Sequence, residues 1–221
     1  FPEDMSSATS NARRPRPAAS PAADESSAAR VRIVDAARQH FFTHGFRSVT
    51  MDDLAAELGM SKKTLYAHFT SKTALLEAVL MNNCARAESD LDRITRGCAG
   101  DFVGALRELL ACVQRHTGEI QPAFIRDMGR EAPETFGIIM RRRREMVERY
   151  FGRLLAEGRK AGFIRKDISV KLVLEILIGA ANGVMIPPKM AELGLTPKTG
   201  FSAIISVILE GIVTTEGRNT L

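Results

Sequence analysis

The chain is poor in the residues that build disulfide-rich or membrane-spanning proteins. Its 221 residues include no tryptophan, two tyrosines and three cysteines. Cys84, Cys98 and Cys112 are odd in number and form no CxxC pair, so we expect free thiols, a reducing compartment and therefore a cytoplasmic protein. The longest apolar run without a charge, residues 176–188, has 13 residues. A bilayer requires ~20, so no membrane partner is expected.

Strand-like alternation is also missing from the sequence after residue 94. Apolar residues recur there at helical spacing, in segments separated by Gly, Pro or Asp. These segments cover residues 101–117, 121–131, 133–161, 168–186 and 198–214. The last two are apolar round most of their circumference, and such a helix must be buried on more than one side. We therefore expect an all-α fold whose last two helices form an oligomer interface or a deep core.

The N-terminal residues differ in composition from the rest. They are rich in Ala, Ser and Pro with almost no large apolar residue, which predicts a disordered arm over residues 1–27. Residues 1–4 take no part in the fold prediction. Arg13, Arg14 and Arg16 could contact phosphates, but keeping the arm soluble is their simpler role.

Three helices are predicted between residues 28 and 73. A first helix is expected from Ser27 to Gly45, because its apolar residues repeat at intervals of three and four. Gly45 can adopt the positive φ that stops a helix. A larger helical domain for effector binding and dimerisation is expected to follow over residues 74–221.

The second and third of these helices are short and joined by a tight turn. Thr50, with Asp53 three residues later, has the pattern of a helix start. Gly59 can stop this helix, and Ser61 can cap the next one, whose Leu65 faces inward. Two short helices with a Gly-containing turn form a helix-turn-helix.

The second of these short helices is suited to DNA. It is ~12 Å long, which fits a major groove ~12 Å wide. Residues 61–72 carry three lysines and no acid, although a solvated face is the alternative for any such cluster. Lysines and capping hydroxyls would contact phosphates, and outward side chains would reach base edges. The candidate contacts are Thr50, Ser61, Lys62, Lys63, Thr64, Tyr66, Ala67, His68 and Lys72.

Residues 46–80 resemble the DNA-binding domain of the TetR (tetracycline repressor) family of bacterial regulators. The matching features are Gly45, Phe46, the Thr50 cap, and the runs DDLAAELGMS, TLYAHF and SK-ALL at uninterrupted spacing. Thr70 stands where proline is usual and Lys63 where glycine is common. Neither departure affects the fold, but Lys63 bears on sequence preference.

The resemblance implies an all-helical homodimer with about nine helices in each subunit. The last two, about residues 168–186 and 198–214, would form a four-helix bundle with their copies. Helices four to seven would enclose a pocket for a small-molecule effector. Such a protein would bind a palindromic operator on double-stranded DNA, in the bacterial cytoplasm and associated with the nucleoid.

Pocket residues can be nominated only from helical spacing. Nine methionines and few aromatics favour a soft apolar cavity for an apolar or amphipathic effector, with His116 and Arg126 as polar anchors. The candidates are Phe102, Leu106, Leu110, His116, Phe124, Arg126, Met128, Phe136, Met140 and Tyr150. Ordinary core packing is the alternative for each apolar one.

Cys112 and His116 lie four residues apart, a spacing that could serve a metal or an activated thiolate. No further ligand cluster or catalytic partner is evident, so no metal, cofactor or enzymatic activity is expected. Three alternatives remain open: a thiol-based redox sensor using Cys84, Cys98 or Cys112, a helical enzyme built around Cys112 and His116, and a non-specific architectural DNA-binding protein.

A run of four arginines, residues 141–144, resembles a nucleic-acid patch. Consecutive residues spread over ~300° of a helix, so they cannot all face one partner. Glu145 and Glu148 lie four residues after Arg141 and Arg144, which predicts a solvated, salt-bridged helix.

Together these patterns predict a sequence-specific DNA-binding transcriptional regulator. Repression, with release from the operator by a small effector, is the expected mode of action.

Overall fold

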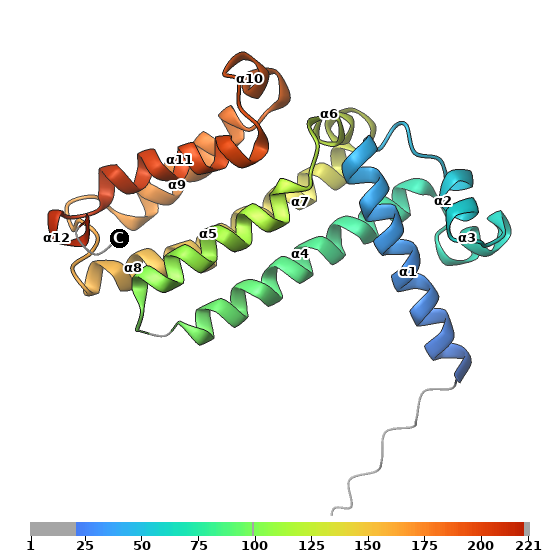
Figure 1. The fold of residues 1–221 in the computed structure, drawn as a ribbon, viewed down its shortest axis with the longest axis horizontal. Helices are drawn as coiled ribbons and strands as arrows, with labels where there is room; N and C mark the ends of the chain where they lie inside the picture. The colour runs from blue at the N-terminus through green and yellow to red at the C-terminus, as the bar shows by residue number, and fades with distance from the viewer. Residues whose placement is uncertain (1–20, 99, 219–221) are drawn as a thin grey trace, which may run out of the picture.

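The computed structural model describes residues 21–98 and 100–218, and over these residues it is built from helices (Figure 1). The β pairing within these ranges is a single isolated antiparallel bridge between Ile164 and Val213. The all-α prediction is confirmed. None of the described helices is long and apolar enough to cross a bilayer.

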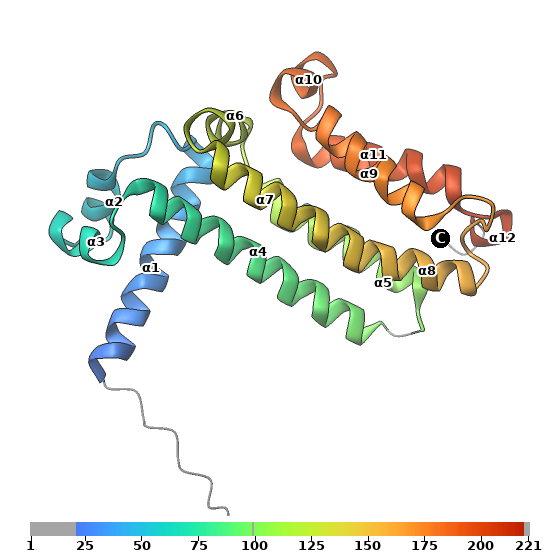
Figure 2. The same cartoon turned by 180° about the vertical axis from the view of Figure 1, so that it is seen from behind.

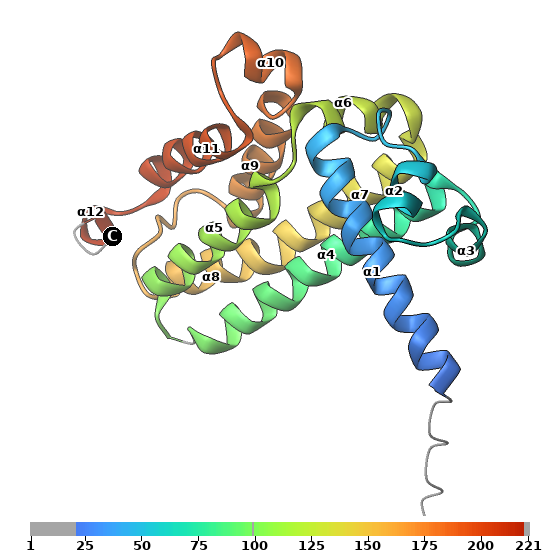
Figure 3. The same ribbon diagram turned by 45° about the vertical axis from the view of Figure 1, so that its right-hand side comes forward.

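The N-terminal helices form a small unit that we call the head. It consists of α1 (Pro21–His44), α2 (Met51–Glu57), α3 (Lys62–His68) and the first turns of α4 (Lys72–Gly97). α2 and α3 lie beside α1 at one end of the molecule, and α4 leads away from them (Figures 1 and 3).

The helix α1 is longer than its sequence pattern predicts. It begins at Pro21, so residues 21–27, assigned to the disordered arm by composition, are helical. Proline fits the first turn of a helix, and the alanines that follow favour helix. The remainder of the predicted arm lies outside the described residues, and with it Arg13, Arg14 and Arg16.

The head has its own apolar core. Phe41 from α1, Leu54 from α2 and Leu65 from α3 are fully buried in it. The inward position predicted for Leu65 is confirmed. Phe124 and Met128, from far along the chain, complete this core. The head is therefore packed against a later helix as well as against its own elements.

The remaining helices form a larger bundle. They are α5 (Phe102–Gly118), α6 (Pro122–Glu131), α7 (Pro133–Met146), the π-helical turn η1 (Val147–Phe151), α8 (Gly152–Lys160), α9 (Val170–Val184), α10 (Pro187–Glu192), α11 (Pro197–Ile212) and α12 (Thr215–Arg218). α4, α5 and the rod made by α7 and α8 run side by side, while α9 and α11 pack on each other and on that layer (Figures 1 and 2).

α4 belongs to both units. Leu75 and Val79 in its first turns pack in the head core, and Leu91 and Ile94 pack in the bundle core. The domain boundary predicted at residue 73 therefore falls near the start of a helix that continues through both cores.

The single helix expected over residues 133–161 contains the π turn η1. Such a turn takes up one residue more than an α-helical turn. Tyr150 and Phe151, which lie in this turn, are both buried. This interruption and the short helices α10 and α12 raise the number of helical segments in the described part of the chain above the nine expected.

Candidate nucleic-acid interface and ligand cavity

The turn between α2 and α3 is fixed by the hydrogen bonds that the sequence pattern predicts. The Asp53 amide donates to Thr50 Oγ1 at 3.1 Å, and the Thr50 amide donates to Asp53 Oδ2 at 3.0 Å. Hydrogen bonds from Thr50 also lower the pKa of Asp53. Gly59 has a φ of +62°, and the Thr64 amide donates to Ser61 Oγ at 3.0 Å. Both predicted helix starts are confirmed, and α3 is held in a fixed orientation relative to α2.

The outer face of α3 is open to solvent. Lys63, Thr64, Tyr66 and Ala67 are exposed, while Leu65 between them is fully buried. Among the described residues, none forms a hydrogen bond or ion pair with the Lys63 ammonium. α3 thus presents a polar, unobstructed face that a DNA groove can accept.

Two of the predicted phosphate contacts already have partners. Lys62 Nζ lies 2.8 Å from Asp52 Oδ1, and this contact raises the pKa of Lys62. Both side chains are exposed, so the pair stabilises the head little and can open to a phosphate. Lys72 is half-buried, with Nζ 4.4 Å from the centre of the Phe46 ring and 3.4 Å from the Arg47 carbonyl oxygen. Burial lowers the pKa of Lys72.

Arg30 contacts the end of α3, and it is not among the residues predicted from the sequence. Its Nη1 donates to the His68 carbonyl oxygen at 2.8 Å, and its guanidinium carbon lies 4.1 Å from the centre of the Phe69 ring. His68 itself is half-buried. The contact depends on how α1 crosses the end of α3, so no local sequence signal marks it.

A cavity of about 620 Å³, partly open to solvent, lies between α4, α5, α6, α7, α9 and α11. Its wall takes residues from both cores, such as Phe124 and Met128 from the head core and Leu177 and Phe201 from the bundle core. Most of the lining side chains are apolar. Small-molecule sites have this size and character.

The structure divides the predicted pocket residues into two groups. The residues that line the cavity are His116, Phe124, Met128, Phe136 and Met140. The residues that do not line it are Phe102, Leu106, Leu110, Arg126 and Tyr150.

In the second group, the side chains of Phe102, Tyr150 and Arg126 point into the core or into solvent and not into the cavity. Phe102 stacks on Phe163 in the bundle core, with ring centres 5.2 Å apart. Tyr150 is buried, and its hydroxyl donates to Asp92 Oδ1 at 2.7 Å. Burial and this contact raise the pKa of Tyr150 to about 12. Arg126 lies on the exposed side of α6. Helical spacing identifies inward residues but not which of them face a void.

Residues 33–79 match the model of the family described as bacterial regulatory proteins, tetR family. They cover the second half of α1, the whole of α2 and α3, and the first turns of α4. The chain belongs to the TetR family. It is a DNA-binding transcriptional regulator, as its relatives are, and TetR-family proteins act as regulators rather than enzymes.

Several relatives extend the likeness over both units. The HTH-type transcriptional regulator UidR of Escherichia coli strain K12 is 24% identical over 193 residues, which are 86% of this chain and 95% of UidR. A TetR transcription regulator from Haloarcula marismortui superposes with a TM-score of 0.68 at 19% identity, over 85% of this chain and 100% of its own. A transcriptional regulator from Saccharomonospora viridis, solved in complex with choline, has a TM-score of 0.63 at 21% identity, over 85% and 99% of the two chains.

In this TetR-family regulator α6 joins the cavity to the head. Phe124 lines the cavity, and its ring centre lies 5.0 Å from that of Phe42 on α1. On the same helix, Asp127 Oδ2 accepts a hydrogen bond from the Arg47 amide at 2.9 Å. Gly45, with a φ of +87°, lies so close that a Cβ there would be 2.8 Å from this oxygen. A displacement of α6 therefore reaches the loop that leads into α2.

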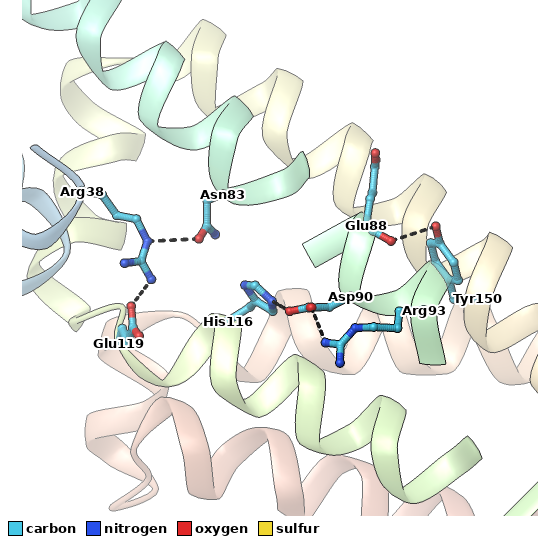
Figure 4. A network of polar contacts seen from close by, with 8 residues as sticks. All are labelled: Arg38, Asn83, Glu88, Asp90, Arg93, His116, Glu119 and Tyr150. Carbon is cyan, nitrogen blue, oxygen red and sulfur yellow. Dashed lines mark hydrogen bonds and ion pairs between the residues drawn. The ribbon is translucent and has the colours of Figure 1, made fainter. Parts of the chain in front are cut away.

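Arg38 of α1 forms a second connection (Figure 4). It makes an ion pair with Glu119 at the end of α5 and donates from Nε to Asn83 Oδ1 at 3.4 Å. Asn83 belongs to α4 and lines the cavity. The cavity is thus linked to α1 as well as to the loop before α2.

A polar network lies beside the cavity (Figure 4). His116 Nε2 is 2.9 Å from Asp90 Oδ2, and Asp90 Oδ1 accepts a hydrogen bond from Arg93 at 2.6 Å. The Cys112 sulfur lies within 4.8 Å of the His116 and Asp90 ligand atoms, a set that could hold Zn²⁺. Burial raises the pKa of Cys112, and both Asp90 oxygens already have partners. This geometry favours an internal hydrogen-bond network over a metal site or a reactive thiolate.

The arginine run of α7 is not the uniformly solvated face that its sequence predicts. Arg144 Nε lies 2.9 Å from Glu148 Oε1, so that predicted pair is confirmed. The pair predicted between Arg141 and Glu145 does not form in the described structure. Arg143 lies in the cavity wall, with most of its surface covered. The run therefore has an inward member as well as outward ones.

Proposed function

We propose that this TetR-family regulator is a repressor that binds a palindromic operator as a homodimer and is released when a small apolar or amphipathic effector fills the cavity. The observation that carries the proposal is a shared set of side chains. Phe124 and Met128 line the cavity and also pack in the core that positions α3. Ligand and DNA would thus act on one connected structure, as coupling between two sites requires.

α3 would lie in the major groove, with Thr64, Tyr66 and Ala67 toward the base edges. Their exposure and the absence of a partner for Lys63 in the described structure support this orientation. Lys62 would exchange its exposed carboxylate partner for a phosphate. Thr50, Ser61, His68 and Lys72 would complete the footprint along the edges of the groove, where backbone N–H groups at helix starts also favour phosphate.

α9 and α11 would form the dimer interface. Leu172 and Ile176 of α9 expose 52% and 50% of their surface, and Val207 of α11 exposes 73%. Large apolar side chains gathered on adjacent helices mark an interaction surface. Packing these helices against their copies would also set the distance between the two α3 helices, which must be about 34 Å for half-sites one DNA turn apart.

Release would follow from a change in that distance. An effector shifts operator affinity only by the difference between its affinities for the two states of the protein. Occupying the cavity would push on Phe124, and the movement of α6 would carry Asp127 and the loop before α2 with it.

Selection from a randomised duplex library at about 150 mM salt, where non-specific binding is weakened, tests the operator proposal. The wild-type protein should recover one inverted repeat, and Tyr66→Ala should lose or alter the base preference. Lys62→Ala should keep the preference, bind all sequences more weakly and lower the salt slope by about 1. Diffuse enrichment with all three proteins would rule out a specific operator.

Asp127→Ala tests the connection through α6. Without the carboxylate, the Arg47 amide loses its partner and the loop before α2 is less well fixed, so affinity for the selected repeat should fall by about fivefold or more. Binding of an uncharged apolar probe to the cavity should be unchanged. Arg130→Ala, an exposed change on the same helix, is the matched control. Equal operator affinity in both variants would show that this contact does not position the head.

A further inference from the structure

We infer that the effector is an anionic amphiphile, whose head group pairs with Arg143 and whose tail fills the apolar part of the cavity. This rests on the proposed use of the cavity as the effector site and adds the charge of the effector. A carboxylate and a phosphate monoester share the required chemistry, because each presents a pair of oxygens that a planar guanidinium can bind with two hydrogen bonds.

Arg143 differs from the residues on either side of it, Arg142 and Arg144, in having no partner. Arg142 Nε lies 3.3 Å from Glu88 Oε1, and Arg144 Nε lies 2.9 Å from Glu148 Oε1. No side chain in the described ranges forms an ion pair or hydrogen bond with the Arg143 guanidinium. Arg141 is also unpaired in the described structure, but it is exposed to solvent. Arg143 is thus the unpaired arginine in the cavity wall that has most of its surface covered.

The charged side chains in the cavity wall are all arginines. They are Arg141, Arg143 and Arg144, and no aspartate or glutamate lines the cavity among the described residues. Arg144 is neutralised by its glutamate partners, and Arg141 is exposed to solvent. His116 is already bonded to Asp90. Arg143 is therefore a covered cation whose counter-ion the described chain does not supply.

A covered guanidinium without a counter-ion is unfavourable, because its lost hydration is not offset by an ion pair. Burial lowers the pKa of Arg143, yet an arginine remains protonated in proteins. The charge therefore persists in the ligand-free protein. An entering anion would remove this penalty, whereas an uncharged ligand would leave it and a cation would add to it.

The apolar part of the cavity wall indicates that the ligand also has a large apolar part. Phe124, Met128, Phe151, Leu177 and Ile178 surround the cavity with apolar surface. Its volume of about 620 Å³ is far larger than one carboxylate or phosphate and lies in the range of sites for drug-sized ligands. A ligand with one negatively charged end and one long apolar part would pair with Arg143 and also fill the apolar volume.

The test compares four ligands with the same twelve-carbon chain: dodecanoate, dodecyl phosphate, dodecan-1-ol and dodecyltrimethylammonium. The three ionic ligands are used below their micelle concentrations and the alcohol below its solubility limit. Binding to the full-length protein is measured by displacement of N-phenyl-1-naphthylamine, an uncharged apolar probe. At least one of the two anions should bind about thirtyfold or more tightly than the alcohol, and the cation should bind most weakly. The tighter anion identifies the head group.

Arg143→Met should abolish the preference for the anion and leave the affinity for the uncharged probe unchanged. Arg143→Lys, which keeps the charge but loses the paired donors, should retain part of the preference. Arg107→Met removes an exposed arginine of α5 that does not line the cavity, so it should behave as the wild type. Without ligand, Arg143→Met should melt at a higher temperature than the wild type, whereas a purely structural role for Arg143 would lower it.

The outcomes separate the two proposals. Displacement of the probe by all four ligands with equal affinity, or an anion preference that survives in Arg143→Met, would overturn the inference about charge and leave the cavity as an effector site. Failure of the wild-type protein to bind the probe or any of the ligands would overturn the cavity as an effector site, and the inference about charge with it.

Discussion

Replacing both Ile176 and Val207 by glutamate is expected to make the protein monomeric and to lower its affinity for the inverted repeat by about a thousandfold or more. The two side chains lie on α9 and α11 and expose 50% and 73% of their surface. In a dimer built on these helices, the glutamates would place unpaired charges in a buried interface. A monomer would hold one half-site only, so its binding should approach the non-specific level. Sedimentation velocity and titration of the selected duplex measure the two effects.

Ile138→Glu provides the matched control for this prediction. Ile138 is 42% exposed on α7, so the substitution places a glutamate at an apolar surface residue outside α9 and α11. This variant should remain dimeric and bind the repeat as the wild type does. A double variant at residues 176 and 207 that stayed dimeric would place the interface elsewhere on the bundle.

Leu65→Ala is expected to lower the free energy of unfolding by about 2–5 kcal/mol and to abolish specific DNA binding. Leu65 is fully buried where α3 meets the head core, so shortening it leaves a cavity that the surrounding helices cannot easily fill. In a chain of this length the melting temperature should fall by roughly 4–20 °C, which calorimetry or circular dichroism would detect.

Tyr66→Ala is the informative comparison, because Tyr66 is the next residue and is 39% exposed. Its removal should change the free energy of unfolding by no more than about 0.5 kcal/mol while altering the bases that are preferred. Equal losses of stability in the Leu65 and Tyr66 variants would contradict the orientation assigned to α3.

The head could be predicted from sequence because its determinants are local. The cap at Thr50, the glycine stop at Gly59 and the cap at Ser61 each act within a few residues, and the structure confirms all three. Leu65 follows from the same helical spacing. The roles of these residues on DNA remain predictions, since they depend on a partner that local structure does not specify.

The cavity could be predicted only in part, because a void is a property of how helices pack. Phe124 and Phe102 have the same helical spacing signal, yet one faces the cavity and the other fills the bundle core. Arg143 was indistinguishable from its neighbours in a charged run, and only the rotation of α7 against the other helices turns it inward. Arg30 and Asp127 also act across long sequence separations, so no short pattern could identify them.

The π turn η1 is a position at which this chain could lose one residue during evolution without disturbing its packing. A π turn holds one extra residue while the α-helical segments on either side keep their facing surfaces. Loss of a single residue between positions 147 and 151 would therefore turn α7 and α8 into one regular helix without rotating Arg143 or Leu154 away from their neighbours. Deletion of one residue elsewhere in either helix would rotate everything beyond it by about 100°. Among homologous sequences, a one-residue gap is thus most readily accommodated at this turn.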